Sequence, residues 1–178
     1  MSPTPITVRR VRAEEAADLV AALAEVLVDC VEGGASVSFM GPLARDKARA
    51  FWRRVASGVQ AGERVLLVAE DARRQVVGTV QLLLDLPENQ PHRADVAKML
   101  VLRSARRQGV ARALLEALDR EALREGRNVL VLDTVTGGDA ERVYERAGWQ
   151  RVGSIPRYAL MPDGAFCATT FFYKQLAQ

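Results

Sequence analysis

The sequence predicts an α+β fold in which a mixed central sheet of about seven strands is flanked by about four helices. Short strand-like runs occur in both halves of the chain, and segments with apolar residues at helical spacing separate several of them. Turn residues divide these segments, and no internal repeat or low-complexity stretch is present. With 178 residues, 49% of them hydrophobic and 26% charged, the chain is expected to form one domain over residues 1–178.

The first half of the chain predicts three strands and two helices. In order, these are a strand at Ile6–Val11, helices at Glu14–Cys30 and Ala48–Val59, and strands at Arg64–Glu70 and Gln75–Leu84. Glycines end both helices, at Gly33-Gly34 and near Gly62. The polar segment Asp71–Arg74 predicts a turn that joins the last two strands as a hairpin.

The second half predicts alternating strands and helices that end in two further strands. In order, these are a strand at Ala94–Leu102, a helix at Arg107–Glu125, a strand at Val129–Asp133, a helix at Asp139–Ala147, and strands at Gln150–Pro156 and Ala168–Lys174. The loop Pro87–His92 precedes the first of these strands, and Asp163-Gly164 predicts a hairpin turn between the last two.

The segment Arg103–Leu114, which directly follows the apolar run Met99–Leu102, is the most informative part of the chain. Its pattern predicts a strand, a turn that contains Gly109, and the start of a helix. This geometry gathers backbone N–H groups and the positive end of a helix dipole at one point. Four arginines surround that point: Arg103, Arg106, Arg107 and Arg112. The sequence therefore predicts an anion site, and a pyrophosphate suits it best.

The short pattern R-x-x-G-x-A could also be an arginine-rich helix start in which the glycine serves close packing, so its surroundings matter. A helix, the strand Val129–Asp133 and a short helix ending in V-Y-E-R-A-G-W follow it. This arrangement resembles the GCN5-related N-acetyltransferase (GNAT) superfamily, in which such a turn holds the pyrophosphate of acetyl-CoA. The matching residues are Arg106, Gly109 and Ala111. The resemblance implies the GNAT fold, with a mostly antiparallel sheet, and acetyl-CoA as the cosubstrate.

The resemblance also implies which residues bind acetyl-CoA. The main chain of Leu100 and Leu102 is expected to pair with the amides of the pantetheine arm, and in the superfamily a bulge in this strand supplies an oxyanion donor. The turn is expected to hold the pyrophosphate through its backbone, with added charge from arginine. The expected set is Leu100, Val101, Leu102, Arg106, Arg107, Gln108, Gly109, Val110, Ala111 and Arg112. Gly137 departs from the family pattern, because many members carry there an asparagine that helps to bind the cofactor.

Two residues are expected to carry the chemistry. Tyr144 lies where this superfamily places a tyrosine that protonates the leaving thiolate, and the ordinary pKa of a phenol, about 10, is close to that of an alkyl thiol. Asp133 ends a strand at the expected cleft, where a carboxylate can take the proton of a substrate ammonium directly or through water. The alternatives are a packing role for Tyr144 and, for Asp133, a turn cap through Thr134 or Thr136 or a contact that holds substrate charge.

Within the superfamily, the chain resembles a branch that acetylates the amine of a small β-lactam amino acid. The resemblance rests on H-R-A-D-V-A-K-M-L-V-L, on L-D-T with a tyrosine eleven residues after the aspartate, and on P-R-Y-A-L-M-P-D-G. It implies direct transfer of acetyl from acetyl-CoA to a primary amine of a small molecule, such as an amino-acid-like toxin or antibiotic. A peptide acceptor and a non-catalytic acyl-CoA sensor remain alternatives. The first two helices match only in general pattern, which leaves the acceptor open.

Other features argue against further function classes. The net charge is +3, but arginine gathers only at the 103–112 turn, so no nucleic-acid partner is expected. No apolar run or leader pattern indicates a membrane or secretion, so a cytoplasmic location is expected. Cys30 and Cys167 suggest neither a disulfide nor a metal site, and neither adjoins an activating motif for a covalent route. An exposed sheet edge leaves a homodimer open.

Single aromatic and imidazole side chains receive simpler interpretations. His92 is the only histidine, and a role as base is conceivable, but its loop position favours a solvated side chain. Phe51 and Trp52 lie on the apolar face of the second helix and are expected in the core. Trp149 is expected to pack at a helix-to-strand junction.

Overall fold

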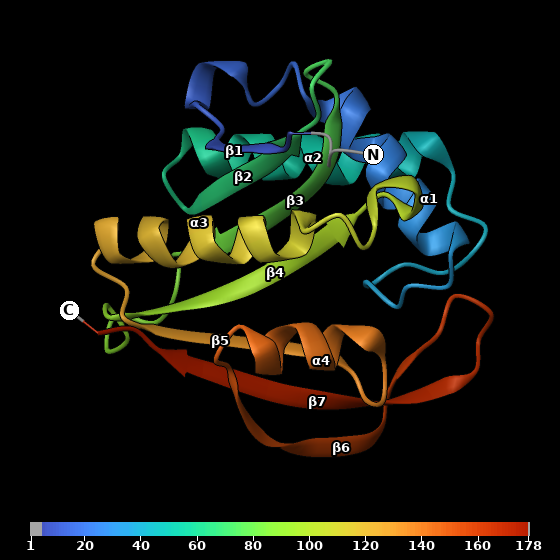
Figure 1. Ribbon diagram of the computed structural model, residues 1–178. Coiled ribbons are helices and arrows are strands. Elements are labelled where there is room, and N and C mark those ends of the chain that lie inside the picture. The colour runs from blue at the N-terminus through green and yellow to red at the C-terminus, as the bar shows by residue number, and fades with distance from the viewer. Residues whose placement is uncertain (1–4, 178) are drawn as a thin grey trace.

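The computed structural model describes residues 5–177, and its strands form one sheet in the order β1-β2-β3-β4-β5-β7-β6 (Figure 1). The strands are β1 (Thr7–Arg10), β2 (Arg64–Glu70), β3 (Val76–Leu83), β4 (Arg93–Val101), β5 (Val129–Val135), β6 (Gln150–Leu160) and β7 (Phe166–Gln175). All neighbouring strands are antiparallel except β4 and β5, which are parallel. The expected mixed and mostly antiparallel sheet is therefore confirmed.

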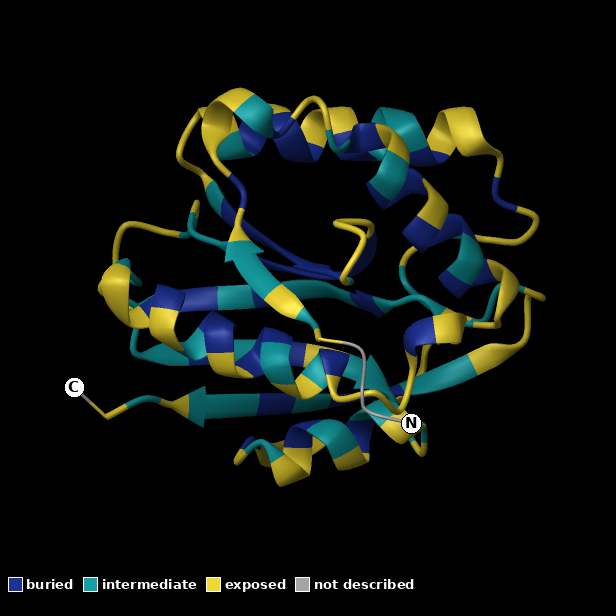
Figure 2. Ribbon diagram, turned by 45° about the horizontal axis from the view of Figure 1, so that its top comes forward, coloured by how far each residue is buried: buried dark blue, intermediate teal, exposed yellow. Residues whose placement is uncertain are grey.

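Helices cover both faces of the sheet. They are α1 (Val20–Glu32), α2 (Arg45–Gln60), α3 (Val110–Arg124) and α4 (Asp139–Arg146), with short 3-10 turns η1 (Ala13–Glu15) and η2 (Arg103–Ala105). Helices α1 and α2 share one hydrophobic cluster with the sheet, centred on the fully buried Trp52, and α3 and α4 share the other with Phe172. Figure 2 shows the helices buried on the sides that face the sheet and exposed on their outer sides. The four expected helices and seven strands are all present.

Helices α1 and α3 begin later than the sequence predicts, each for a local reason. Helix α1 begins at Val20 and not at Glu14, because Ala13–Glu15 forms a separate turn in which the Glu15 carboxylate accepts the backbone N–H of Arg12. Helix α3 begins at Val110 and not at Arg107, because the residues before it turn through left-handed conformations.

The last two strands are longer than predicted, since β6 continues to Leu160 and β7 begins at Phe166. The turn between them holds the expected Asp163-Gly164, where an Asp163 carboxylate oxygen accepts the N–H of Ala165 at 3.0 Å. Nearly all residues of β6 are exposed, so the strand lacks the apolar alternation that would reveal its length in the sequence.

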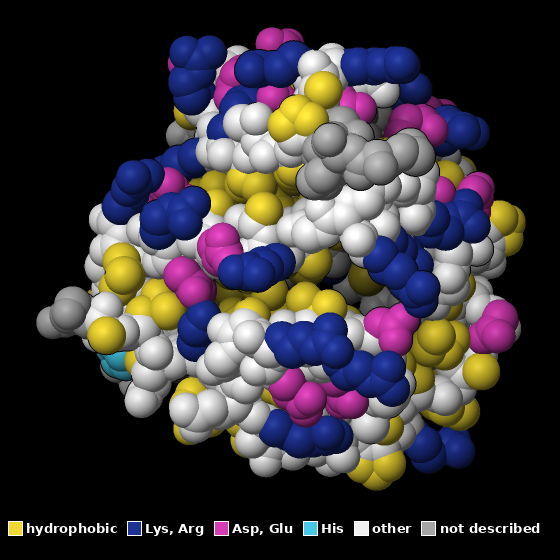
Figure 3. Space-filling view, in the orientation of Figure 1, with side chains coloured by type: hydrophobic (Ala, Val, Ile, Leu, Met, Phe, Trp, Pro, Cys, Tyr) yellow, Lys and Arg dark blue, Asp and Glu magenta, His cyan; other side chains and the backbone are white. Residues whose placement is uncertain are grey.

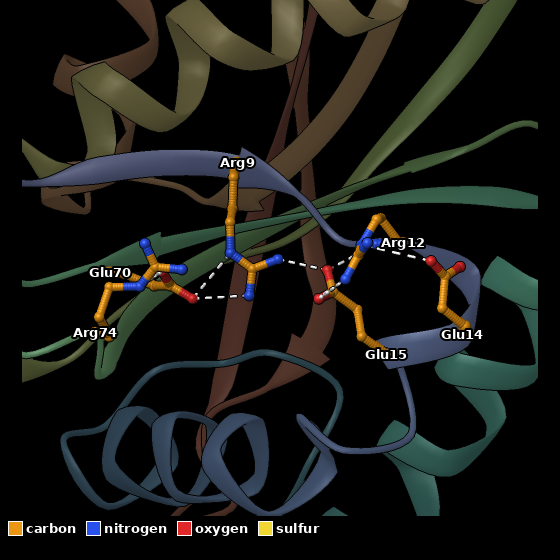
Figure 4. Close-up of polar contacts among 6 residues, drawn as sticks. All are labelled: Arg9, Arg12, Glu14, Glu15, Glu70 and Arg74. Atoms are coloured by element: carbon orange, nitrogen blue, oxygen red, sulfur yellow. Dashed lines mark hydrogen bonds and ion pairs between the residues drawn. The ribbon is translucent and has the colours of Figure 1, made fainter.

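A network of ion pairs holds the β1 edge of the sheet to its neighbours (Figure 4). Arg9 donates to the buried carboxylate of Glu70 from Nε at 3.0 Å and from Nη2 at 2.8 Å. Its Nη1 also bonds Glu15 at 2.5 Å, and Arg74 reaches the second oxygen of Glu70 at 3.2 Å. These hydrogen bonds raise the pKa of Arg9, and the network fixes η1 against the sheet.

The loop between α1 and α2 contacts the turn between β6 and β7. Ser36 Oγ donates to the carbonyl of Leu160 at 2.7 Å, and the N–H of Gly41 donates to the carbonyl of Pro162 at 3.0 Å. The loop therefore rests on the β6–β7 turn. None of the helices between residues 5 and 177 is long and apolar enough to cross a membrane.

Candidate functional site

Strands β4 and β5 separate soon after they begin, and this opening is the centre of the candidate site. They pair only over three residues each, from Arg93 opposite Val129 to Asp95 opposite Val131. Beyond that point β4 continues along β3 and β5 continues along β7, so the two facing edges diverge (Figure 1). Figure 3 shows a recess between the half that carries β1–β4 and the half that carries β5–β7, bordered by basic side chains. Backbone groups along both edges of the opening have no strand partner across it.

The arginine-rich turn lies at the end of β4, as the sequence predicts. Arg107 and Gly109 adopt positive φ angles of 61° and 82°, and Gly109 is the N-cap of α3. No side chain caps this helix, and the first-turn N–H groups of a helix have no acceptor within it. Nothing lies within 4 Å of the place where a Cβ on Gly109 would stand. The turn therefore presents free N–H groups, the positive end of a dipole and open space.

The arginines around this turn have different surroundings. Arg103 is tied to α1, since its backbone N–H and its Nε donate to the two carboxylate oxygens of Asp29 at 2.8 and 2.9 Å. Arg106 lies beside the Cys30 thiol of α1, and Arg112 pairs with Glu116 along α3 at 2.7 Å. Arg107 is exposed and forms no ion pair within residues 5–177. Among the four, Arg107 is therefore the arginine most available to an anion.

Strand β4 contains a bulge at Lys98. The register with β3 advances by two residues from Thr79 to Gln81 but by three on β4, from Leu100 back to Ala97. Lys98 takes up the extra residue with a φ of 52°. The bulge expected from the family resemblance is thus present, and it lies where β4 borders the opening.

Asp133 lies on β5 where that strand has left β4. The sequence placed it at the end of a strand, but β5 continues to Val135 because β7 remains paired with it, with Phe171 opposite Asp133. The side chain reaches water through the opening, yet partial burial between the strands raises the pKa of its carboxyl. The charge of Lys98 lowers this pKa, and the charge of Asp95 raises it.

Tyr144 approaches the same opening from α4. Only 6% of its surface is exposed, and its ring packs against Trp149 and Phe172 with ring centroids 5.9 and 6.0 Å apart. Burial raises the pKa of its phenol, and the nearby charge of Asp133 raises it further. Tyr144 therefore stays protonated over the ordinary pH range, and it lies close enough to Asp133 for their charges to interact. Tyr144 therefore packs in the core and also lies near the carboxylate of Asp133.

A polar cluster fixes α4 on the sheet. Glu141 accepts the backbone N–H of Gly137 at 3.0 Å, and hydrogen bonding with Thr170 lowers the pKa of its carboxyl. Arg151 of β6 lies 3.4 Å from the other oxygen of Glu141. Gly137, which departs from the family pattern, thus has its N–H engaged within the protein. The cluster sets the start of the helix that carries Tyr144.

Two charged residues of the site, Asp95 and Lys98, were not among those predicted from the sequence. Both lie on β4, and the charge of each acts on Asp133. The stretch A-D-V-A-K-M is the available signal, because charged residues are unusual in a buried strand. Their convergence on Asp133 depends on the bulge and on the divergence of β4 and β5, which the sequence pattern does not show.

Other single residues lie as expected or nearly so. Trp149 is buried against Tyr144, and Trp52 is fully buried. Phe51 is only partly buried, because its ring also faces the Lys98 ammonium, 5.6 Å from its centroid. His92 is exposed, before the start of β4 and at the opposite end of that strand from the turn.

The two cysteines are free, and burial raises the pKa of the Cys30 thiol despite the opposing charge of Arg106. Such a thiol is a weak nucleophile. Within residues 5–177, no group of three or more His, Cys, Asp or Glu side chains is placed to hold a metal ion.

A cavity of about 360 Å³ lies between the end of α1, the loop after it and the β6–β7 turn. Its lining residues are Val31, Glu32, Gly34, Gly41, Met161, Pro162 and Asp163. The contacts of Ser36 and Gly41 with the β6–β7 hairpin close this end of the molecule.

The donor set fits acetyl-CoA. A pyrophosphate requires N–H donors and positive charge, which the turn at Gly109 offers. An extended arm with amide groups requires an unpaired strand edge, which β4 offers along the opening. The two features are continuous in the chain, because β4 leads through η2 into the turn.

Comparisons with known proteins agree with this geometry. The acetyltransferase (GNAT) domain family matches residues 62–151. An uncharacterized N-acetyltransferase from the hisH-hisA intergenic region of Azospirillum brasilense is 31% identical over 132 residues, which are 73% of this chain and 76% of that protein. A GNAT superfamily phosphinothricin acetyltransferase from Sinorhizobium meliloti, solved in complex with acetyl-CoA, has a TM-score of 0.78 at 18% identity and covers 97% of this chain and 89% of its own. A GCN5-related N-acetyltransferase from Kribbella flavida has a TM-score of 0.77 at 22% identity, over 96% and 98%.

Proposed function

This chain belongs to the acetyltransferase (GNAT) family and is an acetyl-CoA-dependent N-acetyltransferase, and from this premise we propose that its acceptor is the primary amine of a small, amino-acid-like molecule. The observation that carries the proposal is that Asp133 lies where β5 has left β4 and that its charge acts on the phenol of Tyr144. A carboxylate and a neutral phenol are the two groups that amine acetylation requires: one to remove a proton and one to supply it.

The turn and the edge of β4 form the proposed cofactor site. Bound acetyl-CoA supplies the acetyl group as a reactive thioester. The N–H groups from Gln108 to Arg112 would hold its pyrophosphate, with Arg107 adding charge and Arg106 bracing the turn against α1. The main chain of Leu100, Val101 and Leu102 would pair with the pantetheine arm.

Asp133 would act as the base. A substrate ammonium has no lone pair, so a proton must leave before the nitrogen can attack. The raised pKa of Asp133 makes its carboxylate a better proton acceptor than an ordinary aspartate, and the charge of Lys98 opposes part of this rise. One proton leaves the ammonium for Asp133, the nitrogen then forms a bond to the acetyl carbon, and the carbon–sulfur bond breaks. The second proton lost by the nitrogen replaces the one that Tyr144 gives to the sulfur.

Tyr144 would return a proton to the departing sulfur. Its phenol is neutral because burial and the charge of Asp133 raise its pKa, so the proton is present when a thiolate forms beside it. The proposed transfer is direct. The buried Cys30, with its raised pKa, gives no support to a route through an acylated cysteine.

Two points support a small acceptor of the amino-acid type. The motifs around Asp133 and Tyr144 resemble those of the tabtoxin resistance protein, which acetylates a small β-lactam amino acid. The structurally similar Sinorhizobium meliloti protein is a phosphinothricin acetyltransferase.

A thiol-release assay with acetyl-CoA tests the proposal. The panel contains amino acids, phosphinothricin, β-lactam amino acids, dipeptides, aminoglycosides, polyamines and histone-like peptides. Turnover confined to small amino acids is the expected result. A preference for peptides would move the acceptor to the protein class, and tight acetyl-CoA binding without turnover would indicate a sensor domain.

The exposed edge strand β6 supports a homodimer as a further part of the proposal. Large apolar side chains on this strand are exposed, among them Val152, Ile155 and Tyr158. Light scattering after gel filtration distinguishes one copy from two.

A further inference from the structure

Lys98 is the charged residue of the opening to which the proposed mechanism gives no direct contact with substrate. The bulge in β4 turns its side chain toward α2 and the α1–α2 loop. There the ammonium donates to Ser38 Oγ at 3.1 Å and lies 5.6 Å from the ring centroid of Phe51. Lys98 thus lies between the sheet and the loop that connects α1 to α2.

The Lys98 ammonium has lost water without gaining an anionic partner. Burial lowers its pKa, the charge of Asp133 raises it and the charge of Arg64 lowers it. No carboxylate oxygen within residues 5–177 lies within 4.0 Å of Lys98 Nζ. An ammonium carries three N–H donors, and Ser38 accepts from one of them. A second, negatively charged acceptor would relieve the cost of this burial.

The same face of the sheet carries other donors that lack acceptors. Gln81 is 1% exposed and lies opposite Ala97 of β4, one residue before Lys98. Its Oε1 accepts from Arg64 Nη1 at 3.0 Å, but its Nε2 is buried without a partner, as is Arg64 Nε. Two carboxylates also belong to this opening, at Asp133 and Asp95, and their charges interact. The opening therefore combines donors that lack acceptors with acidic groups.

We infer that Lys98 binds the carboxylate of the acceptor, so that the enzyme acts on α-amino acids in their zwitterionic form, an inference that rests on the proposed function. The acceptor ammonium would lie toward Asp133 and its carboxylate toward Lys98. A direct ion pair between Lys98 and Asp133 would fill the space that the acceptor needs. Within residues 5–177 the two side chains form no such pair. Lys98 then selects the acceptor and moves no proton itself, although its charge lowers the pKa of Asp133.

The experiment compares matched acceptors that differ only at the carboxylate. L-Methionine is paired with L-methioninol and L-phenylalanine with L-phenylalaninol, because the alcohols keep the amine and its basicity while removing the negative charge. The kcat/KM ratio of acid to alcohol is measured for the wild type, Lys98→Gln, Lys98→Arg and Lys47→Gln. Lys47 is an exposed lysine on α2 and serves as the matched control.

The wild type should prefer the acids, and Lys98→Gln should lower the acid-to-alcohol ratio by about 10- to 100-fold, the effect of one charge-assisted hydrogen bond. The loss should appear as a higher KM for the acids, with the KM for acetyl-CoA unchanged. Lys98→Arg should recover part of the ratio, and Lys47→Gln should leave it unaltered. An equal loss for acids and alcohols would overturn the inference, since Lys98 would then act on the chemistry or the fold.

The experiment distinguishes a failure of the inference about Lys98 from a failure of the proposed function. Turnover of alcohols and acids at equal rates by the wild type leaves the acetyltransferase proposal intact and overturns the role of Lys98. If no amine is acetylated, calorimetric titration of the CoA-bound wild type and Lys98→Gln proteins with both amino acids still decides. Binding of the acids that Lys98→Gln weakens supports the inference, and absence of binding, or equal binding, overturns it.

Discussion

The hydroxyl of Tyr144 has no hydrogen-bond partner within residues 5–177, although its ring is packed on both sides by aromatic neighbours. A fully buried phenol without a hydrogen bond would cost stability, but the Tyr144 oxygen is not among the buried polar atoms that lack a partner within residues 5–177. Trp149 and Phe172 hold the ring in place without the hydroxyl. The group is thus free to interact with a ligand in the opening, where Asp133 already influences its pKa.

Replacing Tyr144 with Phe should lower kcat by about 10²- to 10⁴-fold while leaving the affinity for acetyl-CoA nearly unchanged. The ring packing is preserved, so the variant should fold. Steady-state thiol release and calorimetry measure the two quantities. Tyr173→Phe is the matched control, because that hydroxyl bonds only Gln150 at the surface and its loss should not affect turnover. A fully active Tyr144→Phe enzyme would remove the phenol from the mechanism.

The charges of Asp133, Asp95 and Lys98 lead to a second prediction at the scale of single residues. Asp95 raises the pKa of Asp133 and Lys98 lowers it. Since Asp133 must be ionised to accept a proton, kcat/KM should rise with pH through its pKa. Asp95→Asn should move this rise to lower pH, and Lys98→Gln should move it to higher pH. Shifts in the same direction would contradict the assignment of Asp133 as the titrating base.

At the scale of elements, the order β4, η2, turn and α3 brings the strand edge and the helix N-terminus together. Gly109 occupies a left-handed conformation with open space before it, and so does Gly126 at the far end of α3. Both positions carry the same backbone demand, but only one of them faces the proposed pyrophosphate. Substitutions at these two glycines therefore distinguish the cost of backbone strain from an effect on pyrophosphate binding.

Gly109→Ala and Gly126→Ala should each lower the free energy of unfolding by about 1 to 2 kcal/mol, because alanine is strained at positive φ. Only Gly109→Ala should also weaken acetyl-CoA binding, by about tenfold or more, since its methyl group enters the anion site. Chemical denaturation and calorimetry measure these effects. Equal affinity in both folded variants would show that the turn does not hold the pyrophosphate.

Elements with strong apolar periodicity could be predicted from the sequence, and so could the turn at Gly109 that begins α3. The hairpin at Asp71 was predicted from its polar turn residues, and in the structure the Asp71 carboxylate oxygen accepts two backbone N–H groups, a typical turn pattern. The bulge at Lys98 could not be derived from the residues alone, because lysine carries no signal for a positive φ. The length of β6 was missed because its exposed residues lack alternation.

The positions of the proposed catalytic residues could likewise be predicted only in part. Asp133 and Tyr144 were found through the family motifs, whereas their mutual approach depends on how β5 leaves β4. Asp95 was passed over because a single aspartate within a strand shows no partner in the sequence. Charges that converge from β4 and β5 require the sheet to be known.

At the scale of the whole molecule, the site weakens the fold that holds it. The folded protein raises the pKa of Asp133, so the ionised carboxylate is less favourable in the folded chain than in the unfolded one. This cost is absent at low pH, where the group is protonated in both states. It develops as the pH rises from the ordinary value of 3.8 through the raised one.

Asp133→Asn should therefore have a higher Tm than the wild type at about pH 7.5, and the difference should shrink as the pH approaches about 4. Scanning calorimetry at both pH values measures it, and activity should be lost at the same time. Asp18→Asn, at an exposed site, should change Tm little. A less stable Asp133→Asn protein at neutral pH would show that the carboxylate supports the fold.

The short pairing of β4 with β5 also makes the sheet two half-sheets joined by three residue pairs. The bound pantetheine arm would act as the strand missing between them and give the unpaired amides of both edges an acceptor. Hydrogen–deuterium exchange should then be fast at 96–101 and 132–135 in the free protein, on the amides that face the opening. Acetyl-CoA should slow this exchange along β4, so that the ligand completes the hydrogen bonding of the sheet.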